Sequence, residues 1–362
     1  FRYFKKINKE FKVIKFKSGK KVFDWTIPKE WNIKDAYIEH QSKKRFAEFK
    51  KNNLHIVGYS YPIKKKIGKK ELLKKIYTQK NLPNAIPYIT SYYKKDWGFC
   101  LSENDKNKMP KGNYKVFIDS KLKTGSLDLI HSVLKGKSKK EIFFSSYACH
   151  PSMANNELSG PTVTTFLAKW LSSIETLEYS YRFVFIPETI GSITYLSKNH
   201  IEMKKKIFAG FNVTCVGDNR AYSYLPSRNG KTISDIVANH VLKWTDKNFV
   251  IYNWLDRGSD ERQYCAPGID LPVASIMRTK YGKYPEYHTS LDNLKNVVTA
   301  EGLNGGYWAI RRAIEAIEKN KKFKVKVFCE PQLGKRGLYP TISVKKKDED
   351  VTLMQVFLSL CD

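Results

Sequence analysis

The pattern of apolar and polar positions changes near residue 113. Before it, short runs of alternating apolar and polar residues are broken by Pro, Gly and Asn, which is typical of strands and turns. Residues 11–17 and 22–28 alternate on either side of Ser18 and Gly19, which predicts a β-hairpin. One helical stretch is expected, at 70–78. The first third of the chain is therefore predicted to be a small β-rich module.

Beyond residue 113, short apolar runs alternate with segments that carry apolar residues at helical spacing. The run 126–134 fits either a strand or a helix. Alternating strands and helices indicate an α/β fold, with a mostly parallel sheet sandwiched by helices. The predicted strands are 114–119, 142–147, 181–186, 208–216 and 271–277, and the predicted helices are 161–171, 193–199, 231–244 and 300–319.

After residue 320 a loop is followed by an apolar helix, predicted at 351–360, where the chain stops. We expect this tail to be the start of a further small domain, and we expect a segment to precede Phe1, which is not Met. The expected organisation is the start of the core at 1–11, an inserted β-rich domain at 12–112, the α/β domain at 113–320 and the small domain at 321–362.

The composition indicates a folded protein, since 41% of the 362 residues are hydrophobic and 14% are aromatic. The sequence contains no run of about 18 apolar residues, so no membrane span is predicted. The net charge of +30 invites a nucleic-acid or anionic partner, but the lysines are scattered, as in Lys64–Lys66 and Lys204–Lys206. The six cysteines form no CxxC pair and favour reduced thiols in a cytoplasmic protein.

Four predicted strands are each followed by a polar side chain that could do chemistry: His150, Glu188, Asp218 and His288. The carboxyl ends of parallel strands lie at one edge of a sheet, where ligands bind, so these residues could converge. Two imidazoles and a carboxylate are suitable zinc ligands, and a further carboxylate could act as general base. Each residue also has a structural alternative, such as a helix cap for Glu188 or a turn for Asp218.

Five segments, in order, resemble motifs of the zinc aminopeptidase-like proteins of the M28 type. More closely, they resemble a bacterial group labelled polysaccharide biosynthesis proteins with an aminopeptidase-like domain. That resemblance implies an exopeptidase-like α/β core with a small inserted β-domain and a C-terminal winged helix. The segments are 150–160 (HPSMANNELSG), 187–192 (PETIGS), 217–219 (GDN), 258–265 (GSDERQYC) and 287–292 (YHTSLD).

The resemblance implies that His150, Asp218 and His288 are metal ligands and that Glu188 is the general base. Asn156 stands where the two-metal enzymes have a bridging aspartate, and Thr189 where they have a second glutamate. A neutral amide and a hydroxyl cannot offset two Zn²⁺ ions as two carboxylates would. We therefore expect one zinc ion rather than two, with Asn156 and the neighbouring Glu157 as additional candidate ligands.

Asp260, Glu261 and Arg262 offer a clamp for the charged ends of a substrate, or else a buried ion-pair cluster that shapes a loop. Tyr287, beside the last histidine, could donate to an oxyanion or simply pack.

The sequence thus predicts a metal-dependent amide or peptide hydrolase. Its substrate would be a peptide or an amide-bearing small molecule. The alternative is a catalytically degenerate, peptidase-fold binding or regulatory protein, connected with surface-polysaccharide metabolism, whose tail could bind nucleic acid. We expect no membrane partner, and a homo-oligomer is compatible with the sequence.

Overall fold

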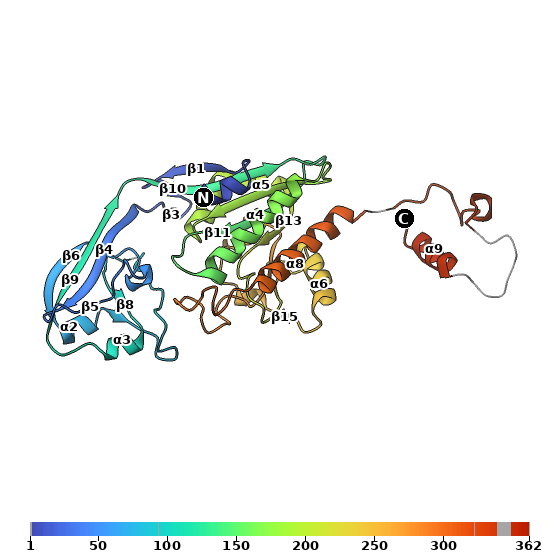
Figure 1. The fold of residues 1–362 in the computed structure, drawn as a ribbon. Helices are drawn as coiled ribbons and strands as arrows, with labels where there is room; N and C mark the ends of the chain where they lie inside the picture. Colours follow the sequence, from blue (N-terminus) through green and yellow to red (C-terminus); the bar gives the residue numbers. More distant parts are fainter. Residues whose placement is uncertain (1, 93, 322, 339–348, 362) are drawn as a thin grey trace. The chain divides into compact units, whose positions relative to one another are not determined.

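The computed structural model describes residues 2–92, 94–321, 323–338 and 349–361, and it forms two compact units, Phe1–Glu315 and Ala316–Asp362. Among the described residues, no helix is both long and apolar enough to cross a membrane. The first unit contains the large sheet and the inserted domain (Figure 1).

The core of the first unit is an eight-stranded mixed sheet in the order β1-β10-β12-β11-β13-β16-β14-β15. Its central strands β11, β12, β13 and β16 run parallel to one another. Every residue of β11 and β12 is buried, as expected for strands covered on both faces. The strands are β1 (Lys12–Lys17), β10 (Ser126–Leu134), β11 (Glu141–Tyr147), β12 (Ser180–Ile186), β13 (Ile207–Asn212), β14 (Ser223–Leu225), β15 (Val250–Ile251) and β16 (Val273–Met277).

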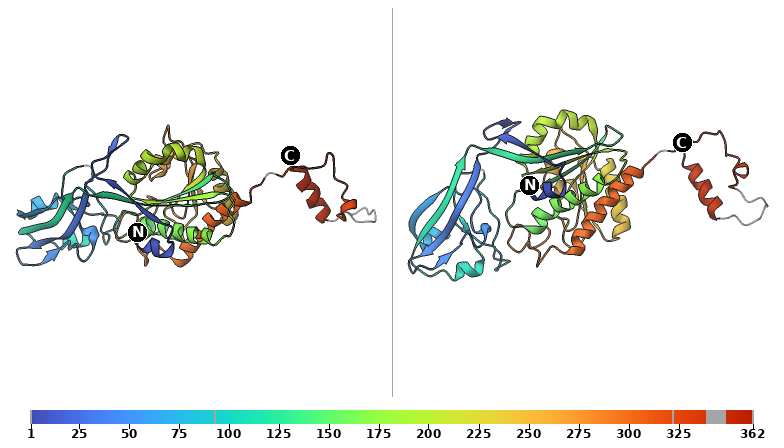
Figure 2. Two further views of the ribbon diagram at one scale, coloured as in Figure 1. Left: turned by 90° about the horizontal axis from the view of Figure 1, so that it is seen from above. Right: turned by 45° about the horizontal axis from the view of Figure 1, so that its top comes forward.

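Helices cover both faces of this sheet, so the predicted sandwich is confirmed. α5 lies on one face and α1 and α4 on the other (Figure 2). α6 packs against β13 and β16. The helices are α1 (Arg2–Ile7), α4 (Ser159–Ser172), α5 (Ile190–Lys206), α6 (Ile233–Thr245), α7 (Glu261–Tyr264) and α8 (Ala300–Lys319).

The inserted domain has its own four-stranded antiparallel sheet, in the order β5-β4-β9-β6, and its own apolar core, which includes Ile38, Trp97, Phe99 and Val116. Its elements are β4 (Glu30–His40), β5 (Arg45–Phe46), η1 (Asn53–His55), β6 (Ile63–Gly68), α2 (Lys69–Leu73), β7 (Ile76–Tyr77), β8 (Phe99–Cys100), α3 (Glu103–Asn107) and β9 (Asn113–Lys123).

The expected borders of the inserted domain were wrong at both ends. β1, expected within it, pairs with β10 in the large sheet, and β9, expected in the core, pairs with β4 and β6 in the small sheet. The predicted hairpin is likewise reduced to β2 (Lys21–Val22) and β3 (Trp25–Thr26). Alternation identifies a strand but not its partner, which is why these borders were misplaced.

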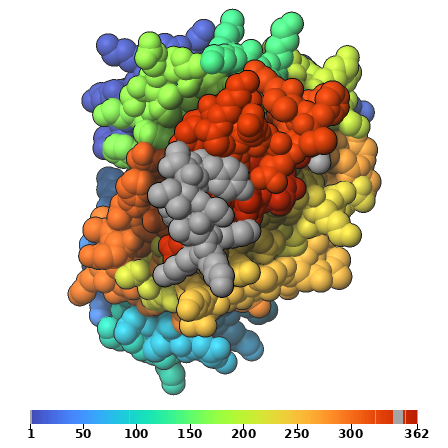
Figure 3. Space-filling model, turned by 90° about the vertical axis from the view of Figure 1, so that its right-hand side faces the viewer, coloured from blue at the N-terminus to red at the C-terminus, as the bar shows by residue number. Residues whose placement is uncertain are grey.

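The second unit, red in Figure 3, contains η4 (Gly334–Arg336) and α9 (Glu349–Ser359). Part of the loop expected before α9 lies outside the described residues. α9 agrees with the helix predicted at 351–360.

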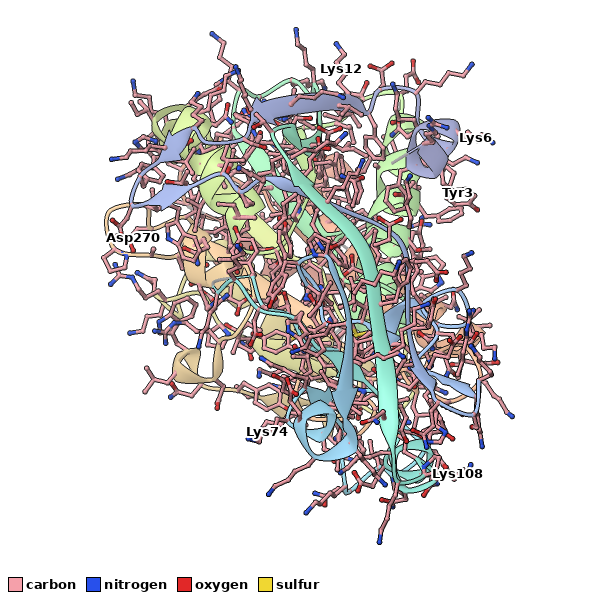
Figure 4. All side chains as sticks on the ribbon, turned by 90° about the vertical axis from the view of Figure 1, so that its left-hand side faces the viewer. Tyr3, Lys6, Lys12, Lys74, Lys108 and Asp270 are labelled. Atoms are coloured by element: carbon pink, nitrogen blue, oxygen red, sulfur yellow. The ribbon has the colours of Figure 1, made fainter. Side chains whose placement is uncertain are left out.

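The basic residues are dispersed over the first unit. Lys6, Lys12, Lys74 and Lys108 are all exposed and point outward from well-separated places (Figure 4). This distribution does not form one basic stripe on the face shown, so the charge by itself does not define a binding surface there.

A buried ion pair joins β11 to β12. Arg182 donates to both carboxylate oxygens of Glu141, at 2.5 and 3.1 Å, and to the Tyr195 hydroxyl at 2.9 Å. Both charged residues are only 3% exposed. Arg182 also lies 3.4 Å from Glu202, whose side chain is half exposed.

We predict that Glu141→Gln lowers the free energy of unfolding by about 3 kcal/mol, because it removes the buried counter-ion of Arg182 and leaves only the half-exposed Glu202 near that charge. Urea denaturation followed by circular dichroism measures this change. Glu202→Gln is the matched control, since it removes a solvent-exposed partner of the same arginine and should cost less than about 1 kcal/mol. Equal effects of the two variants would contradict this account.

Candidate metal centre and active site

Two parallel strands deliver the first two site residues. β11 ends at Tyr147 and is followed by His150, and β12 ends at Ile186 and is followed by Glu188. These strands are paired in register up to Tyr147 and Ile186, so the two loops start side by side. The Nε2 atom of His150 lies 3.5 Å from a carboxylate oxygen of Glu188. The predicted convergence of these two residues is therefore present in the structure.

Glu157 fixes the orientation of His150. One of its oxygens lies 2.9 Å from His150 Nδ1, and the other accepts a hydrogen bond from the backbone N–H of Cys149. A carboxylate on one imidazole nitrogen leaves the other nitrogen available as a ligand. Burial lowers the pKa of His150, but its contacts with Cys149 and Glu157 outweigh burial and raise that pKa well above its ordinary value. Glu157 thus holds Nδ1 and directs Nε2 toward Glu188.

Glu157 is placed by a short π-helix, η2 (Ala154–Leu158), which precedes α4. The carboxylate of Asp292 accepts hydrogen bonds from the backbone N–H groups of Asn155 and Asn156, at 2.7 and 2.9 Å, and from the Tyr284 hydroxyl at 3.0 Å. Asp292 is fully buried. This role of Asp292 was not predicted from the sequence, although Asp292 belongs to the same motif as His288.

His288 completes the cluster from a distant loop. Its ring centroid is 5.2 Å from that of His150, with an angle of 40° between the rings. Its Nε2 atom is buried and has no hydrogen-bond partner among the described residues. Burial, together with the charge on His150, lowers the pKa of His288 to about 3, so the ring stays neutral at neutral pH. A buried, neutral and unpartnered imidazole nitrogen is suited to binding a metal ion.

The spacing of the two rings matches that of two imidazoles bound to one zinc ion. With Zn–N bonds of about 2.0–2.1 Å, two imidazoles on a tetrahedral ion have ring centroids about 5 Å apart. Asn156 is an amide that contacts the Tyr147 hydroxyl, and the Thr189 hydroxyl accepts a hydrogen bond from Arg262. Neither offers the negative charge that two ions would need.

Within the described part of the chain, one group of three His, Cys, Asp or Glu side chains has its ligand atoms within 4.8 Å of one another: Cys149, His150 and Glu157. Cys149 also accepts a hydrogen bond from the backbone N–H of Glu188 at 3.2 Å. The group overlaps the His150 site on its Nδ1 side.

Asp218, the third expected ligand, lies in a network of internal hydrogen bonds. Its carboxylate accepts hydrogen bonds from the Asn155 amide, the backbone of Arg220, and both the backbone and hydroxyl of Thr279. It is fully buried among them. β13 ends at Asn212, whereas the strand was expected to continue to 216, so Asp218 lies further beyond the strand end than expected.

Asp260 and Glu261 form the buried cluster that was the alternative to a substrate clamp. Asp260 accepts from the Thr189 backbone and from Ser192, and so holds the first turn of α5. Glu261 accepts from two backbone N–H groups, the Tyr281 hydroxyl and the Asn212 amide. Both are fully buried, and burial, with the charge of Glu188, raises the pKa of Asp260 to about 8.

Arg262 and Tyr287 each contact a residue of the site. Arg262 is exposed and donates to the Thr189 hydroxyl at 2.9 Å. Tyr287 stacks on His288, with centroids 3.9 Å apart and an angle of 15°. Tyr287 therefore packs against a candidate ligand, whereas Arg262 is available to a substrate.

A cavity of about 460 Å³ opens on this cluster, and we call it the site cavity. His150, Glu188, Thr189 and Cys149 lie in its wall. Its remaining wall is rich in aromatic side chains: Trp25, Tyr59, Tyr88 and Tyr92. The site cavity can therefore hold a small ligand against the carboxylate of Glu188.

The fold and this site define an α/β protein with an aminopeptidase-like core. The family described as domain of unknown function DUF4910 matches residues 2–320, and the chain belongs to that family. A winged helix-turn-helix family matches residues 322–362.

A Clostridium acetobutylicum protein provisionally named a polysaccharide biosynthesis protein with an aminopeptidase-like domain is 45% identical over 327 residues, which are 90% of this chain and 74% of that protein. A crystal structure from the same organism, provisionally described as a peptidase, has a TM-score of 0.87 at 43% identity and covers 91% of this chain and 78% of its own. The zinc aminopeptidase of Bacillus subtilis shares the fold, with a TM-score of 0.62 at 13% identity and coverage of 88% and 87%.

We predict that Asp292→Asn lowers the free energy of unfolding by about 1–3 kcal/mol, because an amide cannot accept from both backbone N–H groups and the Tyr284 hydroxyl as the carboxylate does. Hydrogen exchange of residues 154–157 should accelerate at the same time.

Asp270→Asn is the control for this variant. It removes a half-exposed partner of Arg228 and should change stability by less than about 1 kcal/mol. Unchanged exchange of η2 in Asp292→Asn would show that Asp292 does not hold it.

Proposed function

We propose that this protein is a zinc-dependent hydrolase of amide bonds, of the aminopeptidase type, with one zinc ion held by His150 and His288. The observation that supports this most strongly is the buried, unpartnered Nε2 atom of His288, 5.2 Å ring to ring from His150. The fold shared with zinc aminopeptidases points the same way.

In this proposal Glu188 is the general base. Zinc, when bound, supplies Lewis-acid activation of water and of the substrate carbonyl. Glu188 takes a proton from the attacking water and delivers it to the leaving amine. Burial raises the pKa of Glu188, against the opposing charge of His150, and a raised pKa suits a group that must both accept and return a proton.

Glu157 and the site cavity have supporting roles. Glu157 keeps Nε2 of His150 directed toward Glu188. The cavity orients the amide, and Arg262, which donates to Thr189 of the cavity wall, can hold a negative group of the substrate. The substrate class is a peptide or an amide on a sugar, and the name of the Clostridium relative favours surface-glycan metabolism.

A second function, binding or regulation on a degenerate peptidase core, is favoured by two observations. Asn156 and Thr189 are neutral, and the last 41 residues match a winged helix-turn-helix family. Such a motif can place a helix in the DNA major groove. The zinc measurement below separates the two functions.

We predict that the purified protein, stripped with a chelator and then supplied with zinc, retains about one zinc per chain by elemental mass spectrometry. His150→Ala and His288→Ala should each retain little, because each removes one of the two nitrogens on which the site is built. His240→Ala, which alters an exposed histidine of α6, is the control and should bind as the wild type does. A wild type that binds no zinc would favour the regulatory function.

We predict that Glu188→Gln lowers turnover of aminoacyl p-nitroanilides by at least about 10²-fold with zinc content unchanged, because the amide cannot accept the proton of water. A panel that spans apolar, basic and acidic aminoacyl groups serves as the substrate set. A Gln variant as active as the wild type would remove Glu188 from the mechanism.

A further inference from the structure

A segment of the inserted domain lies against the loop that carries His288. Tyr88 donates from its backbone N–H to the carbonyl of His288 at 2.8 Å, and the backbone N–H of Ser290 donates to the carbonyl of Ile86 at 2.9 Å. The backbone N–H of Ile86 also donates to the Ser290 hydroxyl at 3.0 Å. These bonds form an antiparallel bridge between residues that are about two hundred positions apart in the sequence.

This bridge supports an unusual backbone conformation. His288 has a φ of 55°, in the left-handed region that residues other than glycine rarely adopt. Such a conformation persists only where the surrounding structure imposes it. The inserted domain therefore contributes to holding His288 in place.

The Tyr88 side chain contacts both candidate zinc ligands. Its ring meets that of His150 edge to face at 5.1 Å and 75°, and that of His288 at 5.3 Å and 84°. Edge-to-face packing is a favoured geometry for aromatic rings. With Tyr287 stacked on His288, that imidazole is held between two tyrosines.

The hydroxyl of Tyr88 has no hydrogen-bond partner among the described residues, and Tyr88 lines the site cavity together with His150 and Glu188. A phenol is protonated at neutral pH, so this hydroxyl can donate its proton in a hydrogen bond.

We propose that the inserted domain completes the active site through Tyr88, whose ring positions His150 and His288 and whose hydroxyl donates a hydrogen bond to the carbonyl oxygen of the bound amide. This proposal rests on the hydrolase function proposed above. The donor stabilises the negative charge that develops on that oxygen as water attacks.

Two substitutions separate the ring from the hydroxyl. Tyr88→Phe keeps the ring, so zinc affinity, measured by competition with a chromophoric chelator, should stay within twofold. Its kcat on aminoacyl p-nitroanilides should fall by about 10²-fold with little change in KM, as when one oxyanion donor is removed. Tyr88→Ala should also weaken zinc binding by about tenfold, as for residues that orient ligands.

Tyr77→Phe is the control, because Tyr77 belongs to β7 of the same domain and lies outside the wall of the site cavity. Tyr77→Phe should leave both the zinc affinity and kcat unchanged. Wild-type kcat in Tyr88→Phe would refute the donor role, and wild-type zinc affinity in Tyr88→Ala would refute the positioning role.

Measurements on the wild-type protein separate failure of the proposed hydrolase function from failure of the roles proposed for Tyr88. A wild type that binds zinc but cleaves no member of the panel refutes the hydrolase and the donor role, while the zinc affinities of the two variants still decide the positioning role. A wild type that binds no zinc overturns both.

Discussion

The contact of Glu157 with His150 is the interaction on which the site depends. One carboxylate oxygen of Glu157 contacts His150 Nδ1, and the other accepts a hydrogen bond from the backbone N–H of Cys149. The imidazole can therefore present only Nε2 to Glu188 and to a ligand shared with His288. Burial of Glu157 strengthens this constraint, because a carboxylate removed from water must keep its partners. The η2 helix carries that side chain, and the Asp292 carboxylate accepts hydrogen bonds from the backbone of η2.

The site is assembled from three parts of the chain that are far apart in sequence. The parallel pair β11 and β12 places His150 and Glu188 at one sheet edge. The loop before α8 brings His288, and residues 86–88 of the inserted domain are hydrogen-bonded to that loop. The inserted domain is thus part of the architecture of the site as well as a separate sheet with its own core.

The sequence was sufficient for the α/β layers and for the positions of His150 and Glu188, because a short apolar run followed by a polar loop marks the carboxyl end of a buried strand. It did not determine the roles of Asp218, Asp260 and Glu261. A carboxylate at a loop start looks the same in sequence whether it faces a cavity or accepts several internal hydrogen bonds, as these three do. Tyr88 could not be recognised either, since its contacts depend on a pairing between distant segments.

The central claim is that a single metal ion lies between His150 and His288. Its most direct test is X-ray diffraction from crystals equilibrated with zinc, recorded on both sides of the zinc absorption edge. The account predicts one anomalous peak per chain, about 2.0–2.1 Å from Nε2 of each histidine. A peak among Cys149, His150 Nδ1 and Glu157, or crystals that contain no bound zinc, would contradict it.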